Sequence, residues 1–358
     1  MTISQRRDRL RRRLEAADLS AMLVTDLVNV RYLSGFTGSN AALLIRVDDE
    51  TPVLATDGRY RTQAARQAPD AEVVIERAVG SCLVGQAPAG RVGFESHVVT
   101  VDGFRALERA AADGVDLVRA PGTVEGLREV KDAGEVALLR LACEAADAAL
   151  GALIERGGLR PGRTEREVRN ELEALMLDHG ADGPSFETIV ATGANSAIPH
   201  HRPTDAVLAV GDFVKIDFGA LVAGYHSDTT RTFVLGQAAQ WQRDIYDLVA
   251  TAQRAGREAL APGASLSAVD AASRQVIADA GYAENFGHGL GHGVGLQIHE
   301  APGINATAAG TLLAGAAVTV EPGVYLPDLG GVRIEDTLVV GETTPELLTR
   351  FPKELAIL

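Results

Sequence analysis

The sequence has few of the residues that would indicate an oxidising compartment or a membrane. Only two cysteines, Cys82 and Cys143, occur among 358 residues, which fits a reducing compartment and excludes a thiolate metal cluster. No segment approaches the roughly 18 consecutive apolar residues of a membrane span, and no export signal is recognisable. We therefore expect a cytoplasmic protein with no membrane partner and with both cysteines buried.

Positive charge is scarce relative to negative charge. The chain has 34 basic and 48 acidic residues, a net charge of -14, which argues against a broad basic surface and hence against a nucleic-acid partner. Six arginines lie before position 14, but Leu10 and Leu14 interrupt them at the spacing of one buried helix face. This pattern predicts a first helix whose arginines are solvated.

Acidic residues, in contrast, occur in a regular arrangement. Residues 211–232 alternate in polarity like a strand, and Gly219 and Gly224 then allow the chain to reverse. With a turn centred near residues 222 and 223, Asp217 and Asp228 would face each other at roughly 4.5 to 5.5 Å. Two facing carboxylates repel, so they require a cation between them or a proton on one of them.

An internal repeat supplies a second pair of acids. Residues 315–341 align with residues 211–232, and they place Glu321 and Glu335 on the two arms of another predicted hairpin. A Pro-Gly pair and a helical segment precede each hairpin. Two such halves packed about a pseudo-twofold axis would bring four carboxylates together, and a dinuclear metal centre would compensate their charge.

A histidine-rich and glycine-rich segment lies between the two hairpins. His288, His292 and His299 fall within residues 285–300, where the glycines would permit close backbone approach to an ion or substrate. One imidazole, from His292, among four carboxylates gives an oxygen-rich site that favours Mn(II), with Co(II), Fe(II) or Zn(II) feasible. Two such ions can hold a shared hydroxide near neutral pH, so the chemistry predicted is metal-assisted hydrolysis.

The order of the predicted elements divides the chain into two domains. Residues 1–122 contain short strands separated by helical segments, as in an α/β domain. Residues 123–131 read as a linker. Residues 132–358 begin with a helix that Asp132 and Glu135 would cap, and they contain both halves of the repeat.

In these features the chain resembles the pita-bread dinuclear metallopeptidases, in particular the Xaa-Pro aminopeptidase and Xaa-Pro dipeptidase (prolidase) branch. The resemblance covers nearly the whole length and implies an α+β fold with a creatinase-like N-terminal domain, which the methionine aminopeptidases lack. The motifs that carry it are PHHRP at 199–203, VKIDFG at 214–219, SDTTRTF at 227–233, GHGLGHGVGL at 287–296, EPGVY at 321–325, GVRIED at 331–336, YLSGFTGSN at 32–40 and TDGRY at 56–60.

The resemblance also implies roles for individual residues. Asp228 and Glu335 would bridge two metal ions, Asp217 would bind one of them, and His292 with Glu321 would complete the other. All five are present, unlike in relatives such as creatinase that have lost metal ligands.

Further residues match the catalytic and substrate positions of that family. Glu321 also matches a proton shuttle, and His200 and His299 match residues that steady the scissile carbonyl and its oxyanion. His288, Tyr325 and Arg333 match positions near the proline pocket. For Tyr325 core packing is the alternative, and for Arg333 a structural salt bridge to a ligand carboxylate.

The resemblance therefore predicts hydrolysis of peptides with proline at the second position. We favour an Xaa-Pro aminopeptidase, with an Xaa-Pro dipeptidase as the alternative. Hydrolysis of another C-N bond, or peptide binding without catalysis, would fit the same fold. Relatives commonly form dimers, so a homodimer is expected as well.

Overall fold

The computed structural model describes residues 2–358, and the chain divides into two compact units after Arg128. The point of division falls inside the segment 123–131, where a short helix, α6 (Glu125–Arg128), also lies.

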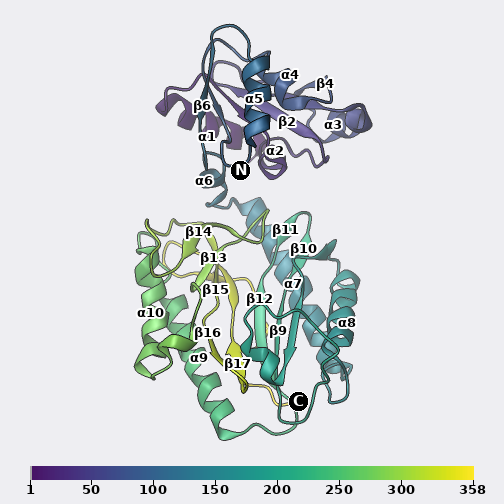
Figure 1. Ribbon diagram of the computed structural model, residues 1–358, viewed down its shortest axis with the longest axis vertical. Helices are drawn as coiled ribbons and strands as arrows, with labels where there is room; N and C mark the ends of the chain where they lie inside the picture. The colour runs from purple at the N-terminus through teal and green to yellow at the C-terminus, as the bar shows by residue number, and fades with distance from the viewer. Residues whose placement is uncertain (1) are drawn as a thin grey trace. The chain divides into compact units, whose positions relative to one another are not determined.

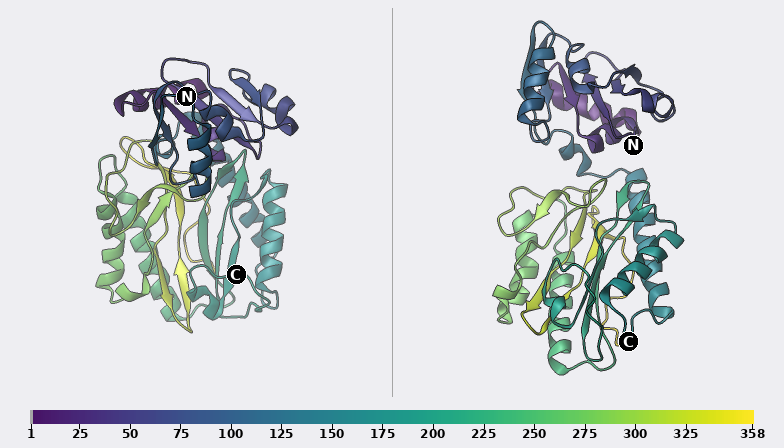
Figure 2. Two further views of the ribbon diagram at one scale, coloured as in Figure 1. Left: turned by 45° about the horizontal axis from the view of Figure 1, so that its top comes forward. Right: turned by 45° about the vertical axis from the view of Figure 1, so that its right-hand side comes forward.

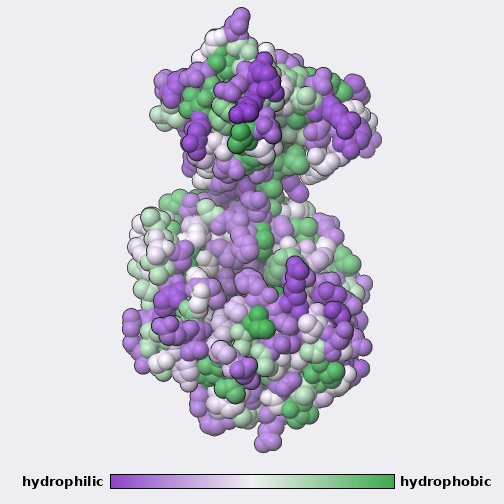
Figure 3. Space-filling view, in the orientation of Figure 1, coloured by the Kyte–Doolittle hydropathy of each residue, from purple (hydrophilic) through white to green (hydrophobic). Residues whose placement is uncertain are grey.

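Within the described residues no helix is long and apolar enough to cross a bilayer. In the view of Figure 3, exposed apolar residues are scattered among hydrophilic ones.

The first unit is built on one six-stranded sheet with the order β4-β3-β2-β1-β5-β6. The strands β1 to β3 pair antiparallel, and the outer pairs β3-β4, β1-β5 and β5-β6 are parallel. Short strands and helical segments alternate in this unit, as the sequence predicted. The unit contains β1 (Ala21–Val24), β2 (Ala41–Arg46), β3 (Val53–Thr56), β4 (Glu72–Ile75), β5 (Gly90–Phe94), β6 (Val115–Arg119), α1 (Ile3–Ala16), α2 (Leu27–Ser34), α3 (Arg61–Gln67), α4 (Val79–Val84) and α5 (Val101–Ala110).

The predicted first helix and its buried face at Leu10 and Leu14 are confirmed, but two arginines of α1 are not solvated, so that part of the prediction was wrong. Arg7 is buried, donates to the carbonyl of Leu33 and pairs with Asp70. Arg11 is also buried and donates to two backbone carbonyls, those of Arg46 at 3.1 Å and Glu50 at 2.6 Å. A charge run gives no sign of such contacts, because the carbonyls come from residues 26 to 39 positions away in the sequence. The expectation for the cysteines holds only for Cys143, since Cys82 is half-exposed.

The second unit has the two-half construction that the repeat predicts. In the first half, α7 (Ala133–Glu155) and α8 (Glu165–Asp178) lie beside the sheet β12-β9-β8, and in the second half α9 (Gln240–Glu258) and α10 (Leu266–Asp279) lie beside the sheet β14-β13-β15-β18-β19. Figures 1 and 2 show the strands between the two helix pairs. The predicted capping box at Asp132 is formed, and a second one, at Thr164, begins α8.

The strands of this unit are short, and most occur in antiparallel hairpins. They are β7 (Gly183–Pro184), β8 (Ile189–Thr192), β9 (Phe213–Phe218), β10 (Ala220–Val222), β11 (Tyr225–His226), β12 (Thr229–Val234), β13 (Gly291–Gly293), β14 (Glu300–Ile304), β15 (Ala317–Val320), β16 (Gly323–Leu326), β17 (Gly330–Arg333), β18 (Asp336–Val339) and β19 (Glu346–Leu347).

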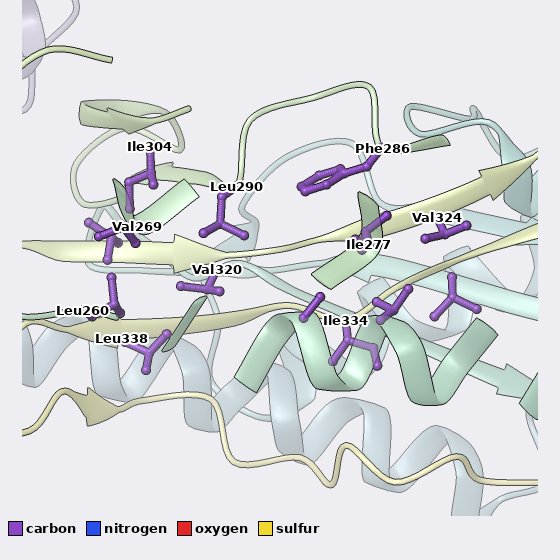
Figure 4. Close-up of a cluster of buried hydrophobic side chains, with 14 of the residues drawn as sticks. Leu260, Val269, Ile277, Phe286, Leu290, Ile304, Val320, Val324, Ile334 and Leu338 are labelled. Atoms are coloured by element: carbon purple, nitrogen blue, oxygen red, sulfur yellow. The ribbon is translucent and has the colours of Figure 1, made fainter. Parts of the chain in front are cut away.

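Each half has its own apolar core between helices and strands, and the acids stand at the edge of these cores. Figure 4 shows the core of the second half, where Val320, Ile334 and Leu338 pack with residues from α10 and the loop after it. Because successive side chains along a strand point to opposite faces, burying Val320 and Ile334 turns the adjacent Glu321 and Glu335 away from the core.

The register of the first hairpin differs from the prediction by two residues. Asp217 pairs with Thr230, and Asp228 lies just before β12. The reversal consists of Ala223 and Gly224, both with positive φ (46° and 79°), as in a two-residue type I′ turn. A non-glycine residue in that conformation is uncommon, so the sequence pointed to the wrong turn centre. In the second hairpin Glu321 and Glu335 belong to the two arms, as predicted, and the pairing of Val320 with Asp336 puts them opposite each other.

The two halves are joined beside these acids. The backbone amide of Glu335 donates to the carbonyl of Thr230 at 3.1 Å, and the Thr337 hydroxyl donates to the carbonyl of Asp228 at 2.9 Å. These cross-links fix the acidic ends of both hairpins at one place.

Candidate metal centre and its cavity

The second unit contains a cavity of about 830 Å³ that brings nearly all the predicted site residues together. Tyr325 is the exception, because it is buried behind the wall of the cavity. The lining includes the five predicted metal ligands and four of the other predicted residues: Asp217, Asp228, His292, Glu321, Glu335, His200, His288, His299 and Arg333.

The centre of the group is formed by Asp228, His292 and Glu335. Each offers one ligand atom, and these atoms all lie within 4.8 Å of one another. The Nε2 atom of His292 is 3.5 Å from Asp228 Oδ2 and 3.4 Å from Glu321 Oε1. Two ligand atoms bound about 2.1 Å from one ion are about 3.0 to 3.5 Å apart at ordinary coordination angles, so the spacing suits a metal ion.

The tautomer of His292 points to the same conclusion. Its Nδ1 lies 3.0 Å from the carbonyl of Gly293, which can only accept, so Nδ1 carries the proton. Burial lowers the pKa of His292 to about 4, so Nε2 presents a lone pair near neutral pH. That lone pair faces the carboxylate oxygens of Asp228 and Glu321, an arrangement that calls for a cation or a shared proton between them.

Asp217 provides an independent test of whether a cation fits. Its Oδ2 accepts from Arg333, but Oδ1 is buried and has no hydrogen-bond partner among the described residues. A buried carboxylate oxygen without a partner is costly, and coordination to a metal ion would satisfy it. The residues present therefore fit a divalent metal.

Three of the clustered carboxylates also have raised pKa values. Burial, together with the charges of the neighbouring carboxylates, raises the pKa values of Asp228 and Glu335 well above the ordinary range. Burial likewise raises the pKa of Glu321 to about 8, with Asp217 contributing and Arg333 opposing. Without metal, protons must replace the missing positive charge, so metal and protons compete for the same carboxylates.

The candidate substrate residues form a hydrogen-bonded network behind the acids. The Nη1 atom of Arg333 donates to the Tyr325 hydroxyl at 2.8 Å, and that hydroxyl lies 2.8 Å from Nε2 of His288. Burial, with the Arg333 charge, lowers the pKa of His288 to about 4, so its neutral ring accepts the tyrosine proton. The contact of Arg333 with Asp217 matches the structural salt bridge considered for this arginine.

His200 and His299 reach the cavity from two different loops. Both side chains are exposed there, and the His299 ring stands edge-on to His292 at a centroid distance of 4.4 Å. Partial loss of solvent around the ring and the nearby Arg333 charge lower the pKa of His200, so this imidazole is neutral near pH 7 and can donate one N-H. The two histidines therefore line the same cavity as the acids, but they are not among the predicted metal ligands.

Lys215 supports the site, although no sequence pattern indicates this role. Its side chain is fully buried on β9, and Nζ donates to the carbonyls of Ile198 at 2.7 Å and Pro199 at 3.3 Å. Arg333 donates to the same Pro199 carbonyl at 3.2 Å. The backbone just before His200 is therefore held by two buried basic side chains. The alternating strand pattern predicts only the direction of the Lys215 side chain, not this contact.

A second unexpected support is Glu165, on the other side of the same loop. Its Oε1 accepts from the Thr192 amide and the Asn195 side chain, each at 2.9 Å. Its Oε2 lies 2.8 Å from His201 Nε2 and accepts from the amide and hydroxyl of Thr204, also at 2.8 Å. The residue stands within the capping motif of α8, so its local pattern predicted only a helix start.

We expect Glu165→Ala to lower the free energy of unfolding by about 3 to 5 kcal/mol, because the donors grouped around this fully buried carboxylate would lose their acceptor. Burial alone would raise the pKa of Glu165, but its hydrogen bonds outweigh this and lower it. The stabilisation is therefore present above pH 4.5, the unperturbed value, and is lost as the pH falls through the folded-state pKa.

Urea unfolding of wild type and variant between pH 3 and 7 measures this difference. Glu173→Ala, at a half-buried position of the same helix, is the matched control and should change stability by less than about 1 kcal/mol. Equal losses in both variants at pH 7 would contradict the assignment.

Comparison with known proteins gives matches along nearly the whole chain. Residues 6–130 match the creatinase/prolidase N-terminal domain, and residues 137–342 match metallopeptidase family M24. The Xaa-Pro dipeptidase of Pyrococcus furiosus is 35% identical over 356 residues, which cover 99% of this chain and 100% of that protein.

Two solved structures have the same architecture. The Xaa-Pro dipeptidase from Bacillus anthracis superposes with a TM-score of 0.94 at 38% identity, covering 100% of both chains. The X-Pro aminopeptidase from Thermotoga maritima superposes with a TM-score of 0.89 at 32% identity, covering 98% of this chain and 99% of that one.

Proposed function

The chain belongs to metallopeptidase family M24, and on that premise we propose that it is an Xaa-Pro dipeptidase. The family resemblance and the two-part pita-bread fold predicted from the motifs are confirmed. The preference for an aminopeptidase is revised, because the similar proteins support the dipeptidase alternative better. The similarity to the Thermotoga enzyme keeps the aminopeptidase as the second candidate.

The proposal of metal-assisted hydrolysis rests on one group of side chains in the cavity. The Nε2 lone pair of His292 and the carboxylates of Asp228, Glu321 and Glu335 converge in one cavity, and Asp217 adds an unpaired buried oxygen. These five residues would hold two divalent ions, for which the oxygen-rich donor set favours Mn(II). Such ions, when bound, supply Lewis acidity that lowers the pKa of water and polarises a carbonyl.

Side chains of the cavity would then transfer a proton and stabilise the negative charge on the carbonyl oxygen. Glu321 lines the cavity beside His292, and we assign it the transfer of a proton from the attacking water to the departing nitrogen. His200 and His299 line the same cavity and would donate N-H groups to the carbonyl oxygen as negative charge develops on it.

The proline substrate agrees with these roles. An Xaa-Pro bond has no amide N-H, so a site that recognises its substrate through that donor would fail. Here the residues directed at the reacting group act on the carbonyl side and on the leaving nitrogen, and neither role needs the missing donor.

The test uses protein stripped of metal with a chelator and then supplied with Mn(II). We expect restored cleavage of the dipeptide Ala-Pro and little cleavage of Ala-Pro-Ala. Comparable cleavage of the tripeptide would favour the aminopeptidase instead. Absence of cleavage of either peptide, with metal shown to be bound, would overturn the proline assignment.

We also propose a homodimer, as the resemblance implies. Light scattering of the purified protein should give twice the mass of the chain. A monomer at assay concentration would contradict this.

A further inference from the structure

The cavity presents one arginine that the predicted site did not include. Among the described residues that line it, the only lysine or arginine side chains are those of Arg202 and Arg333. The Arg333 guanidinium is buried and donates to Asp217, Tyr325, Thr230 and a backbone carbonyl. The side chain of Arg202 is 82% exposed and makes one ion pair, with Glu187 at 3.0 Å.

The backbone that carries Arg202 is anchored on both sides. Before it, the carbonyl of Pro199 accepts from Lys215 and Arg333. Next to it, His201 contacts the buried Glu165, which also accepts from Thr204. The long side chain of Arg202 therefore starts from a fixed point, and its guanidinium can turn without movement of the loop.

The position of Arg202 relative to His200 suits a short substrate. Two residues span at most about 7 Å, so the Cα atoms of His200 and Arg202 lie within that distance. If His200 contacts the scissile carbonyl, the carboxylate of the following proline lies one residue farther along the substrate. An arginine side chain reaches about as far as two residues of chain, so Arg202 can meet this carboxylate inside the cavity.

The present partner of Arg202 is easily replaced. Glu187 is itself 53% exposed, and exposed ion pairs of this kind contribute little to stability. A planar guanidinium binds a carboxylate best through two parallel hydrogen bonds, an arrangement that a substrate carboxylate can provide. Exchanging Glu187 for the substrate would therefore cost little.

We propose that Arg202 binds the free C-terminal carboxylate of an Xaa-Pro dipeptide and exchanges Glu187 for it when substrate enters. Arg202 is then a specificity-determining residue that favours dipeptides over longer peptides. This inference rests on the proposed dipeptidase function and adds to it the group that recognises the end of the substrate.

The experiment compares Ala-Pro with Ala-Pro amide, which lacks the negative charge, using Mn(II)-loaded protein. In Arg202→Gln we expect KM for Ala-Pro to rise 10- to 100-fold with kcat nearly unchanged, because the lost contact binds ground state and transition state alike. KM for the amide should change by less than about twofold. Glu187→Gln should lower KM for Ala-Pro about 2- to 5-fold, since it removes the competing carboxylate.

Arg243→Gln, at an exposed position of α9 outside the cavity lining, is the matched control and should leave both KM values unchanged. An unchanged KM for Ala-Pro in Arg202→Gln would overturn the inference while wild-type cleavage of Ala-Pro upholds the function. An equal rise for the dipeptide and its amide would also overturn it, because charge recognition would be excluded. Failure of the wild type to cleave Ala-Pro would instead overturn the proposed function, and the inference with it.

Discussion

Replacement of Asp228 by asparagine is expected to lower kcat/KM at least about a thousandfold while making the metal-free protein more stable. Asp228 is 5% exposed, and its ligand oxygen lies within the cluster formed with His292 and Glu335. An amide lacks the negative charge with which a carboxylate would hold a divalent cation in the proposed centre, so metal binding and hydrolysis should both fail.

The stability of this variant should move in the opposite direction. Without metal, burial and the charges of Glu335, Asp217 and Glu321 all disfavour the ionised form of Asp228, which is why its pKa is raised. A neutral amide of similar shape removes that penalty, and we expect a gain of about 1 to 2 kcal/mol in the free energy of unfolding.

Kinetics with added Mn(II) and urea unfolding in chelator measure the two effects on the same preparation. The control is Asp244→Asn, at an exposed position of α9, which should change neither quantity appreciably. A variant that keeps more than a tenth of wild-type activity would show that Asp228 is not a metal ligand.

The repeat explains why much of the candidate site could be predicted before the fold was known. Aligning Asp217 with Glu321 and Asp228 with Glu335 implies that each half carries its acids at equivalent places, and the antiparallel hairpins follow from local alternation and glycines. The exact register depended on one turn. Ala223 adopts a left-handed conformation, which is uncommon for alanine, so the sequence did not indicate a turn at this position. The observed pairing of the two strands therefore differs from the predicted pairing by two residues.

The supporting residues could not be predicted because their partners are distant in sequence. Glu165 accepts from residues 192 to 204, and Lys215 donates to residues 198 and 199, so neither contact leaves a periodic signal. Arg7 and Arg11 were misread for the same reason. Burial of a charged side chain is decided by which loops bring donors or acceptors to it, and this information is tertiary.

The two adjacent histidines illustrate the same limit. His200 is exposed in the cavity, whereas His201 is buried and contacts Glu165. The sequence motif does not distinguish the roles of the two histidines. Only the contact of His201 with Glu165 on α8 shows that His201 is structural, whereas His200 is a candidate catalytic group.

Metal binding is expected to produce the largest change in the stability of the protein, and the size of the change should depend on pH. An ion present at a thousand times its dissociation constant stabilises the folded state by about 4 kcal/mol per site. Two sites would therefore raise the melting temperature by about 15 to 30 °C for a unit of this size.

The pH dependence follows from the raised pKa values in the metal-free state. Because the pKa of Glu321 is raised from 4.5 to about 8, the folded protein holds a proton that the unfolded chain has released between these values. Metal-free stability should accordingly fall as the pH rises from 4.5 to 8, and Asp228 and Glu335 act in the same direction. Metal requires deprotonated ligands, so its stabilising effect should grow over the same range.

Thermal unfolding of chelator-treated and Mn(II)-loaded protein at pH 5, 6, 7 and 8 measures the gap between the two states. We expect the gap to widen steadily with pH, and in Asp228→Asn to be small at every pH because the variant has lost both the metal and one of the competing protons. Other titrating groups affect both states of the wild type equally and cancel from the gap. A gap that stays constant from pH 5 to 8 would mean that protons and metal do not compete for these carboxylates, which contradicts a centre built from Asp217, Asp228, Glu321 and Glu335.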